Sequence, residues 1–108
     1  MGATQGRVLV IAGSDSGGGA GIQADIKTIT ALGGYAASAV TAVTVQDTLG
    51  VHAIHPIPPA IIAGQIRAVL ADIGADAIKT GMLGDAAAVE AVRRRWQAGR
   101  PSRWSSTR

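Results

Sequence analysis

Residues 7–24, which read RVLVIAGSDSGGGAGIQA, decide the fold. They open with five apolar residues, 8–12, and such a continuous aliphatic run is typical of a strand buried on both faces of a parallel sheet. The run ends at Gly13 in a loop of Ser, Asp and Gly, and an amphipathic pattern begins near Ala20. In open parallel sheets, ligands bind where a strand passes through such a loop into a helix. Glycine lets backbone N–H groups approach a ligand closely, and the helix dipole favours negative charge. We therefore place the candidate site in this loop.

The rest of the chain continues the alternation of strands and helices. The loop leads into a helix that stops at Gly33, and residues 35–45 are rich in β-branched residues, as expected of a second buried strand. We then expect a short strand at 51–57, a helix opening at Pro58 and Pro59, a strand at 76–80, and a last helix capped by Asp85. The buried stripes of the last two helices are predicted to contain Ile62, Ile66, Val69, Leu70 and Ile73, and Val89, Val92 and Trp96. This order predicts an α/β fold with a doubly wound, mostly parallel sheet and flanking helices.

Composition limits the classes of function. The chain has 108 residues, enough for one domain, and it has no cysteine, which excludes a disulfide framework and a Cys-based zinc site. No stretch resembles a signal peptide or a membrane span, so we expect a cytoplasmic protein without a membrane partner. The net charge of +3 comes from six arginines in residues 93–108, where there is no acid. Because the basic charge is confined to this tail, we do not expect a nucleic-acid partner.

Familiar phosphate and nucleophile motifs fit the loop poorly. A P-loop is excluded, because no lysine follows the glycines until Lys27. Residues 19–24 fit G-x-G-x-x-[GA], but a dinucleotide fingerprint starts directly after its strand, and here about six loop residues intervene. Residues 13–17 have the spacing of a nucleophile elbow, with Asp15 where serine is required. What remains is a loop that wraps a small polar ligand.

Two segments together give a more specific indication. The loop motif GSDSGGGAGIQAD and the later pattern T-x-x-T-x-Q-D-T, residues 41–48, closely resemble the hydroxymethylpyrimidine/phosphomethylpyrimidine kinases of thiamine biosynthesis. The resemblance covers nearly all of residues 7–92. It implies a ribokinase-like fold and ATP-dependent phosphorylation of 4-amino-5-hydroxymethyl-2-methylpyrimidine and then of its monophosphate, with ATP and Mg²⁺ as cofactors. A homodimer is compatible with the full-length family.

The same resemblance implies a pyrimidine pocket made by Gly13, Ala20, Asp25, Thr44, Gln46 and Met82. Gln46 suits a flat aminopyrimidine because a carboxamide is both donor and acceptor, and backbone groups of Gly13 and Thr44 would complete the set. Met82 would pack on the ring, and Asp25 would orient the hydroxymethyl group or anchor the loop. Each has a structural alternative: Asp25 as a helix cap or a partner of loop N–H groups, Gln46 as a polar strand end, and Met82 as core.

Three other polar residues receive no functional assignment. His52 and His55 are three apart on an expected strand, where they point to opposite faces and do not share a metal, so no metal site is predicted. Lys79 is expected to pair with Asp76 or Asp72 and to have no catalytic role.

The chain departs from the family in length and in its tail. Family members are more than twice as long, and their second half is expected to supply the ATP site, the anion hole and the catalytic base, so we predict no catalytic residue here. We assign residues 1–98 to the N-terminal portion of the kinase domain and 99–108 to an aberrant basic tail. One GC-rich choice of codons for this tail, when it is read in another frame, would encode an aliphatic strand ending in Asp-Pro, so we interpret the tail as a frameshift product.

Two other functions remain open. One is a pyridoxal or pyridoxine kinase-like protein of the same fold, which would bind a different alcohol. The other is a non-catalytic module that binds a vitamin precursor without ATP.

Overall fold

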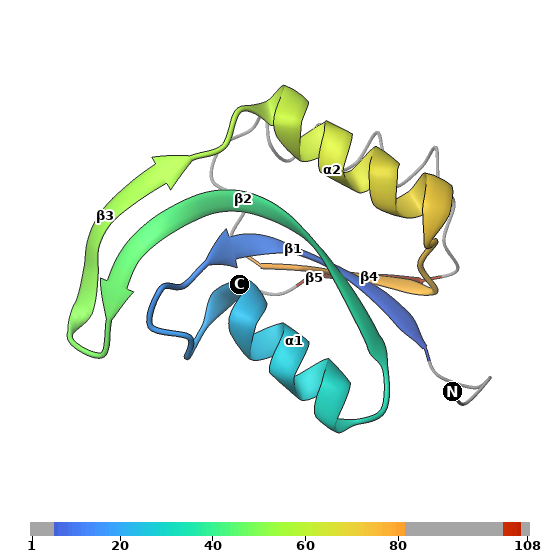
Figure 1. The fold of residues 1–108 in the computed structure, drawn as a ribbon, viewed down its shortest axis with the longest axis horizontal. Coiled ribbons are helices and arrows are strands. Elements are labelled where there is room, and N and C mark those ends of the chain that lie inside the picture. Colours follow the sequence, from blue (N-terminus) through green and yellow to red (C-terminus); the bar gives the residue numbers. More distant parts are fainter. Residues whose placement is uncertain (1–5, 82–102, 107–108) are drawn as a thin grey trace.

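A computed structural model describes residues 6–81 and 103–106 (Figure 1). The elements in chain order are β1 (Arg7–Ser14), α1 (Gly21–Ala31), β2 (Tyr35–Asp47), β3 (Gly50–Pro56), α2 (Pro59–Asp72), β4 (Ala77–Thr80) and β5 (Arg103–Ser106). Six of them confirm the expected order, with ends shifted by a few residues. The helix expected from Asp85 and its inner residues lie outside the described residues, as does Met82.

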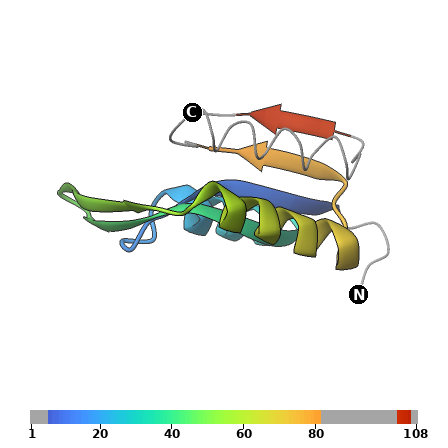
Figure 2. The same ribbon diagram turned by 90° about the horizontal axis from the view of Figure 1, so that it is seen from above.

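The strands form one sheet in the order β3-β2-β1-β4-β5. β1 pairs in parallel with both β2 and β4, β5 pairs in parallel with β4, and β3 alone is antiparallel, on the outer edge of β2. Figure 2 shows β5, β4 and β1 side by side, and in Figure 1 the paired ends of β2 and β3 extend past the end of β1. The mostly parallel α/β sheet is thereby confirmed.

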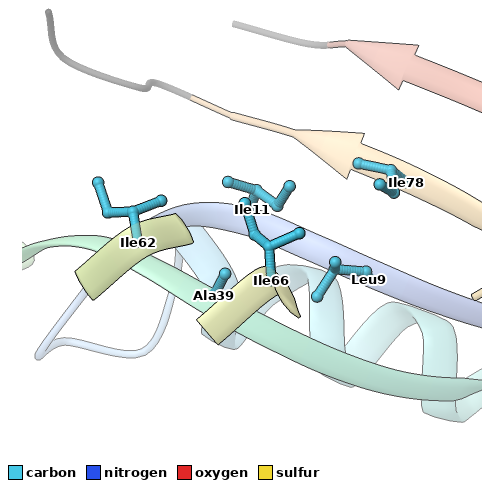
Figure 3. Close-up of a cluster of buried hydrophobic side chains, with 6 residues drawn as sticks. All are labelled: Leu9, Ile11, Ala39, Ile62, Ile66 and Ile78. Carbon is cyan, nitrogen blue, oxygen red and sulfur yellow. The ribbon is translucent and has the colours of Figure 1, made fainter. Parts of the chain in front are cut away.

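The helices cover opposite faces of the sheet (Figure 1), and successive residues of β1 point alternately to the two faces. On one face, Leu9 and Ile11 pack with Ile62 and Ile66 of α2 and with Ile78 of β4 (Figure 3). On the other face, Val10 and Ala12 pack with Ile22 of α1. The continuous apolar run of β1 therefore fills two cores at once, and it places the loop that follows it at the carboxyl end of the sheet.

The basic tail contains a strand that the sequence did not predict. β5 has the sequence RWSS and aligns with Ala77–Thr80 of β4. Backbone pairing needs no hydrophobic period, so the absence of one in the tail did not exclude a strand. The division at residue 98 and the frameshift origin of the tail stay predictions.

None of the helices within residues 6–81 and 103–106 is long and apolar enough to span a membrane.

Candidate functional site

The loop between β1 and α1 is shaped by one buried carboxylate. Asp15 is only 6% exposed, and its side chain accepts backbone N–H groups from Gly17 at 2.7 Å, Gly19 at 3.0 Å and Ala20 at 2.8 Å. Ala20 caps α1 with no side-chain hydrogen bond of its own, so Asp15 supplies the negative charge that a helix N-terminus favours. The alternative reading of Asp25 as the partner of the loop N–H groups is therefore wrong.

Asp15 also decides which ligands the loop can take. The amides of Gly17, Gly19 and Ala20 would bind a phosphate only if they were available, and they already donate to the protein's own carboxylate. A phosphate placed at these amides would compete with the Asp15 carboxylate and would be repelled by its charge. The anion expected at the N-terminus of α1 is therefore the Asp15 carboxylate.

Side chains of α1 hold the loop from the other side. The Gln23 amide oxygen accepts the Asp15 N–H at 2.8 Å, and its Nε2 donates to the Ser14 hydroxyl at 2.8 Å. Lys27 donates its Nζ to the Gly18 carbonyl oxygen at 2.8 Å. The loop is thus fixed by hydrogen bonds at both of its ends and in its middle.

The loop is also joined to the end of β2. The Ser16 hydroxyl donates to the Gln46 carbonyl oxygen at 2.5 Å and accepts the Gln46 N–H at 2.8 Å. The Thr44 hydroxyl donates to the Ser14 carbonyl oxygen at 2.7 Å. The pairing of β1 with β2 shifts register after Ala12 and Val40, and its last pair is Ser14 with Val43. The serine and threonine contacts continue the connection beyond this last pair.

Thr44 and Gln46 therefore lie together beside the loop, as expected of them. Residues two apart on a strand share a face, and the Thr44 Oγ1 and Gln46 Oε1 atoms are 3.1 Å apart. In the antiparallel ladder Ile54 is paired with Thr44, and Val51 is paired with Gln46 after a register shift between Val45 and Gln46. Because of this shift, the face of Thr44 and Gln46 carries both apolar side chains, which are 58% and 52% exposed. A polar pair with an apolar flank suits a flat heterocycle with polar edges.

The two backbone candidates lie where the loop begins and ends. Gly13 is in β1, and a Cβ built on Gly21, which has a φ of +60°, would lie 2.3 Å from the Gly13 carbonyl oxygen. Ala20 precedes α1 and is held by Asp15. Only glycine at position 21 allows this close return of the chain, which closes the loop.

Asp25 has a different neighbour from the one that the sequence suggested. Its carboxylate on α1 forms an ion pair with Lys79 of β4, and the Asp25 side chain is 16% exposed. The expected pairing of Lys79 with Asp76 or Asp72 is wrong, because successive β4 residues alternate in direction and Lys79 points to the α1 face. Asp76 instead binds Arg7, at 2.9 Å.

Within the described residues, neither histidine belongs to a group of three or more side chains that could bind a metal. The His52 Nε2 atom of β3 lies 2.9 Å from the Asp47 Oδ2 atom at the end of β2, and His55 is exposed. The pKa of Asp47 is lowered, first by the Leu49 N–H and then by His52. Within residues 6–81 and 103–106, no three acidic or histidine side chains come together as metal ligands.

Sequence reasoning missed Asp15, Ser16 and Gln23. An aspartate two residues before a glycine in a turn is a known acceptor of backbone N–H groups, and that signal could have identified Asp15. No local pattern indicates the bond from Ser16 to Gln46, since the two residues are 30 apart in the chain.

Known proteins share this fold and these motifs. The family described as phosphomethylpyrimidine kinase matches residues 15–103. The hydroxymethylpyrimidine/phosphomethylpyrimidine kinase of Mycobacterium leprae is 59% identical over 95 residues, which cover 88% of this chain and 34% of that protein. This chain thus spans about a third of the length of the curated relatives that it matches.

Two solved structures support the same assignment. The phosphomethylpyrimidine kinase of Clostridium difficile 630 matches with a TM-score of 0.89 at 41% identity, over 94% of this chain and 44% of its own. A pyridoxal kinase from Staphylococcus aureus, in complex with AMP-PCP and pyridoxal, matches with a TM-score of 0.86 at 36% identity, over 96% and 39%. They confirm the ribokinase-like fold. With the family match covering most of its length, this chain belongs to the phosphomethylpyrimidine kinase family.

Proposed function

We propose that the chain is the pyrimidine-binding part of a kinase that transfers phosphate from ATP to 4-amino-5-hydroxymethyl-2-methylpyrimidine and then to its monophosphate. The observation that carries the proposal is the grouping of Thr44 and Gln46 beside a loop held by Asp15, with Ile54 and Val51 on the same face. The carboxamide recognises the polar edge of the ring, and the apolar side chains contact its face.

The other proposed ligand contacts complete the pocket. Backbone groups of Gly13, Ala20 and Thr44 bind the remaining ring polar atoms, and Met82 packs on the ring. Asp25 orients the hydroxymethyl group with the carboxylate that also binds Lys79. This ion pair holds the Asp25 carboxylate of α1 against Lys79 of β4.

The catalytic groups and the sites for ATP and Mg²⁺ belong, in this proposal, to a part of the enzyme outside this chain. ATP supplies the phosphoryl group, and Mg²⁺ neutralises its charge during transfer. The occupied amides of the glycine loop support this division, because they leave no place for the phosphates here. This chain contributes binding and orientation of the alcohol.

The setting of the enzyme is part of the proposal. We place the full-length kinase in the cytoplasm, with a small-molecule substrate, no nucleic-acid or membrane partner, and a homodimer as a compatible assembly.

A pyridoxal or pyridoxine kinase is the second candidate, favoured by the likeness to the Staphylococcus aureus pyridoxal kinase. The two functions differ in the ring that the pocket prefers. A binding module without catalytic partners is the third, and it would bind the pyrimidine in the same way.

Calorimetry with the full 108-residue chain tests the proposal. We expect it to bind the hydroxymethylpyrimidine more tightly than pyridoxine, and Gln46→Leu to weaken pyrimidine binding at least about tenfold, since the hydrogen bonds to the ring edge are lost. His55→Leu is the matched control, because His55 is exposed and faces Val43, away from Thr44 and Gln46.

Three results would contradict parts of the proposal. Tighter binding of pyridoxine would favour the second candidate, and equal loss in both leucine variants would remove Gln46 from the site. ATP-dependent phosphorylation by the purified chain would overturn the placement of the catalytic groups outside it.

A further inference from the structure

The Thr44 hydroxyl lies between two oxygen atoms. Its Oγ1 is 2.7 Å from the Ser14 carbonyl oxygen and 3.1 Å from the Gln46 Oε1. A threonine hydroxyl has a single proton, so it can donate to one of these oxygens at a time. The shorter contact, to an oxygen that is always an acceptor, takes the proton.

The second contact then has the wrong chemistry for an amide oxygen. With its proton directed to Ser14, the Thr44 oxygen turns lone pairs toward Gln46, and an amide oxygen there would be repelled. The two ends of a carboxamide have nearly the same shape, and the hydrogen-bond network decides which end is which. A half-turn of the amide brings Nε2 to Thr44, where it donates to Oγ1.

The backbone of Gln46 is held beside the loop, and its side chain contacts Thr44. The Ser16 hydroxyl binds both the N–H and the carbonyl oxygen of Gln46, and the strand continues on either side. Within the described residues, Thr44 is the one hydrogen-bond partner of the Gln46 side chain. The hydroxyl of Thr44 is thus the group that selects the amide orientation.

We propose that Thr44 is a positioning residue whose hydroxyl, by donating to Ser14 and accepting from Gln46 Nε2, makes Gln46 present its carbonyl oxygen to the ligand. The ligand part of this inference rests on the proposed function. A free carbonyl oxygen selects a heterocycle with an exocyclic amine at that position. It disfavours one with an ether or carbonyl oxygen there, because two acceptors would face each other.

A measurement on the ligand-free 108-residue chain tests the orientation itself. In NMR spectra we expect nuclear Overhauser effects from the Gln46 Hε2 protons to the Thr44 side chain. We expect the Hε2 protons to exchange faster with water in Thr44→Val, which removes the hydroxyl and keeps the shape, and to exchange as in the parent in Thr44→Ser. Hε2 protons that show no effect to Thr44, or that exchange alike in all three proteins, would overturn the proposal.

A second measurement tests the selectivity. We compare binding of the 4-amino pyrimidine alcohol with binding of its 4-methoxy counterpart, and expect the parent and Thr44→Ser to prefer the amine by about tenfold or more. In Thr44→Val the amide is free to turn, and the preference should fall to about threefold or less. An unchanged preference in Thr44→Val would overturn the positioning role.

The two measurements separate this inference from the proposed function. If the NMR contacts are present but the parent chain binds neither pyrimidine, the orientation by Thr44 is supported and the proposed function fails. If the parent binds the amine and the NMR contacts are missing, the proposed function stands and the role of Thr44 is wrong.

Discussion

At the scale of single residues, Asp15 takes the role that the position of Asp25, ten residues later, suggests. Asp25 lies in the first turns of α1, where a carboxylate is expected to serve the helix N-terminus. The structure gives that task to Asp15, which precedes the helix and is buried, and gives Asp25 an ion pair with β4. A carboxylate before the helix can reach several loop N–H groups at once, whereas one within the first turns points along the helix surface.

Gly21 gives a residue-scale prediction with an internal control. Gly21→Ala should lower the free energy of unfolding by at least about 2 kcal/mol, because its φ of +60° is costly for alanine and its Cβ would lie 2.3 Å from the Gly13 carbonyl oxygen. Gly64→Ala, inside α2 with its nearest contact at 4.0 Å, should raise it by about 0.5–1 kcal/mol. Urea unfolding of both variants measures the contrast. A Gly21 variant as stable as the parent would show that the loop does not need this close return.

At the scale of elements, β2 has different partners along its length. β3 pairs with the outer edge of β2 only from Ala42 to Asp47, and before Ala42 the Gln65 side chain of α2 binds this edge. The Gln65 Oε1 accepts the Val40 N–H at 2.8 Å, and its Nε2 donates to the Val40 carbonyl oxygen at 3.0 Å. The Gln65 amide thus makes the two hydrogen bonds that the backbone of a neighbouring strand would make, and these bonds attach α2 to the edge of the sheet.

We therefore expect Gln65→Leu to cost about 2 kcal/mol of stability, because both polar groups of a partly buried backbone residue lose their partner. Hydrogen exchange at the Val40 amide should accelerate more than at its neighbours in β2. Arg67→Leu, at an exposed position of the same helix, is the control and should change neither quantity appreciably. Equal effects of the two substitutions would mean that the amide does not dock the helix.

At the scale of the whole molecule, an exposed cluster around Arg7 adds to the backbone pairing of β1 with β4. The Arg7 guanidinium and backbone N–H both bind the Asp76 carboxylate, and Arg7 also donates to the Ile73 carbonyl oxygen at 2.8 Å. These bonds, the guanidinium first, lower the pKa of Asp76 to about 2. The cluster fixes where β4 begins beside β1.

The stability of the fold should depend on pH through this pair. A carboxylate whose pKa is lowered by folding stabilises the native state above its unfolded pKa, near 3.9, and that contribution is lost as the pH falls toward the folded value. Asp76→Asn should therefore be less stable than the parent at neutral pH, and the difference should shrink between about pH 4 and about pH 2. Thermal unfolding across this range measures it, with the exposed Asp72→Asn as control. A stability difference that stays constant with pH would show that the negative charge of Asp76 does not contribute to stability.

Most elements of the fold, and the grouping of Thr44 with Gln46, could be predicted from the sequence. Val8 to Ala12 and the periodic helices carry their signals within a few residues. The strand in the tail could not be predicted, because it depends on backbone pairing with β4 and not on its own side chains. The pocket assignments of Gly13, Ala20, Asp25, Thr44, Gln46 and Met82 stay predictions.

By itself, then, the sequence determined the apolar strand, the glycine loop, the helix after it and the family to which the chain belongs. Only the tertiary structure decided that Asp15 accepts the N–H groups of the loop, that the Ser16 hydroxyl binds the Gln46 backbone, and that Lys79 binds Asp25. The physical reason is the range of the interactions. Strand and helix signals act between near neighbours, whereas the last two contacts join residues 30 and 54 apart, which meet only when β1 is inserted between β2 and β4.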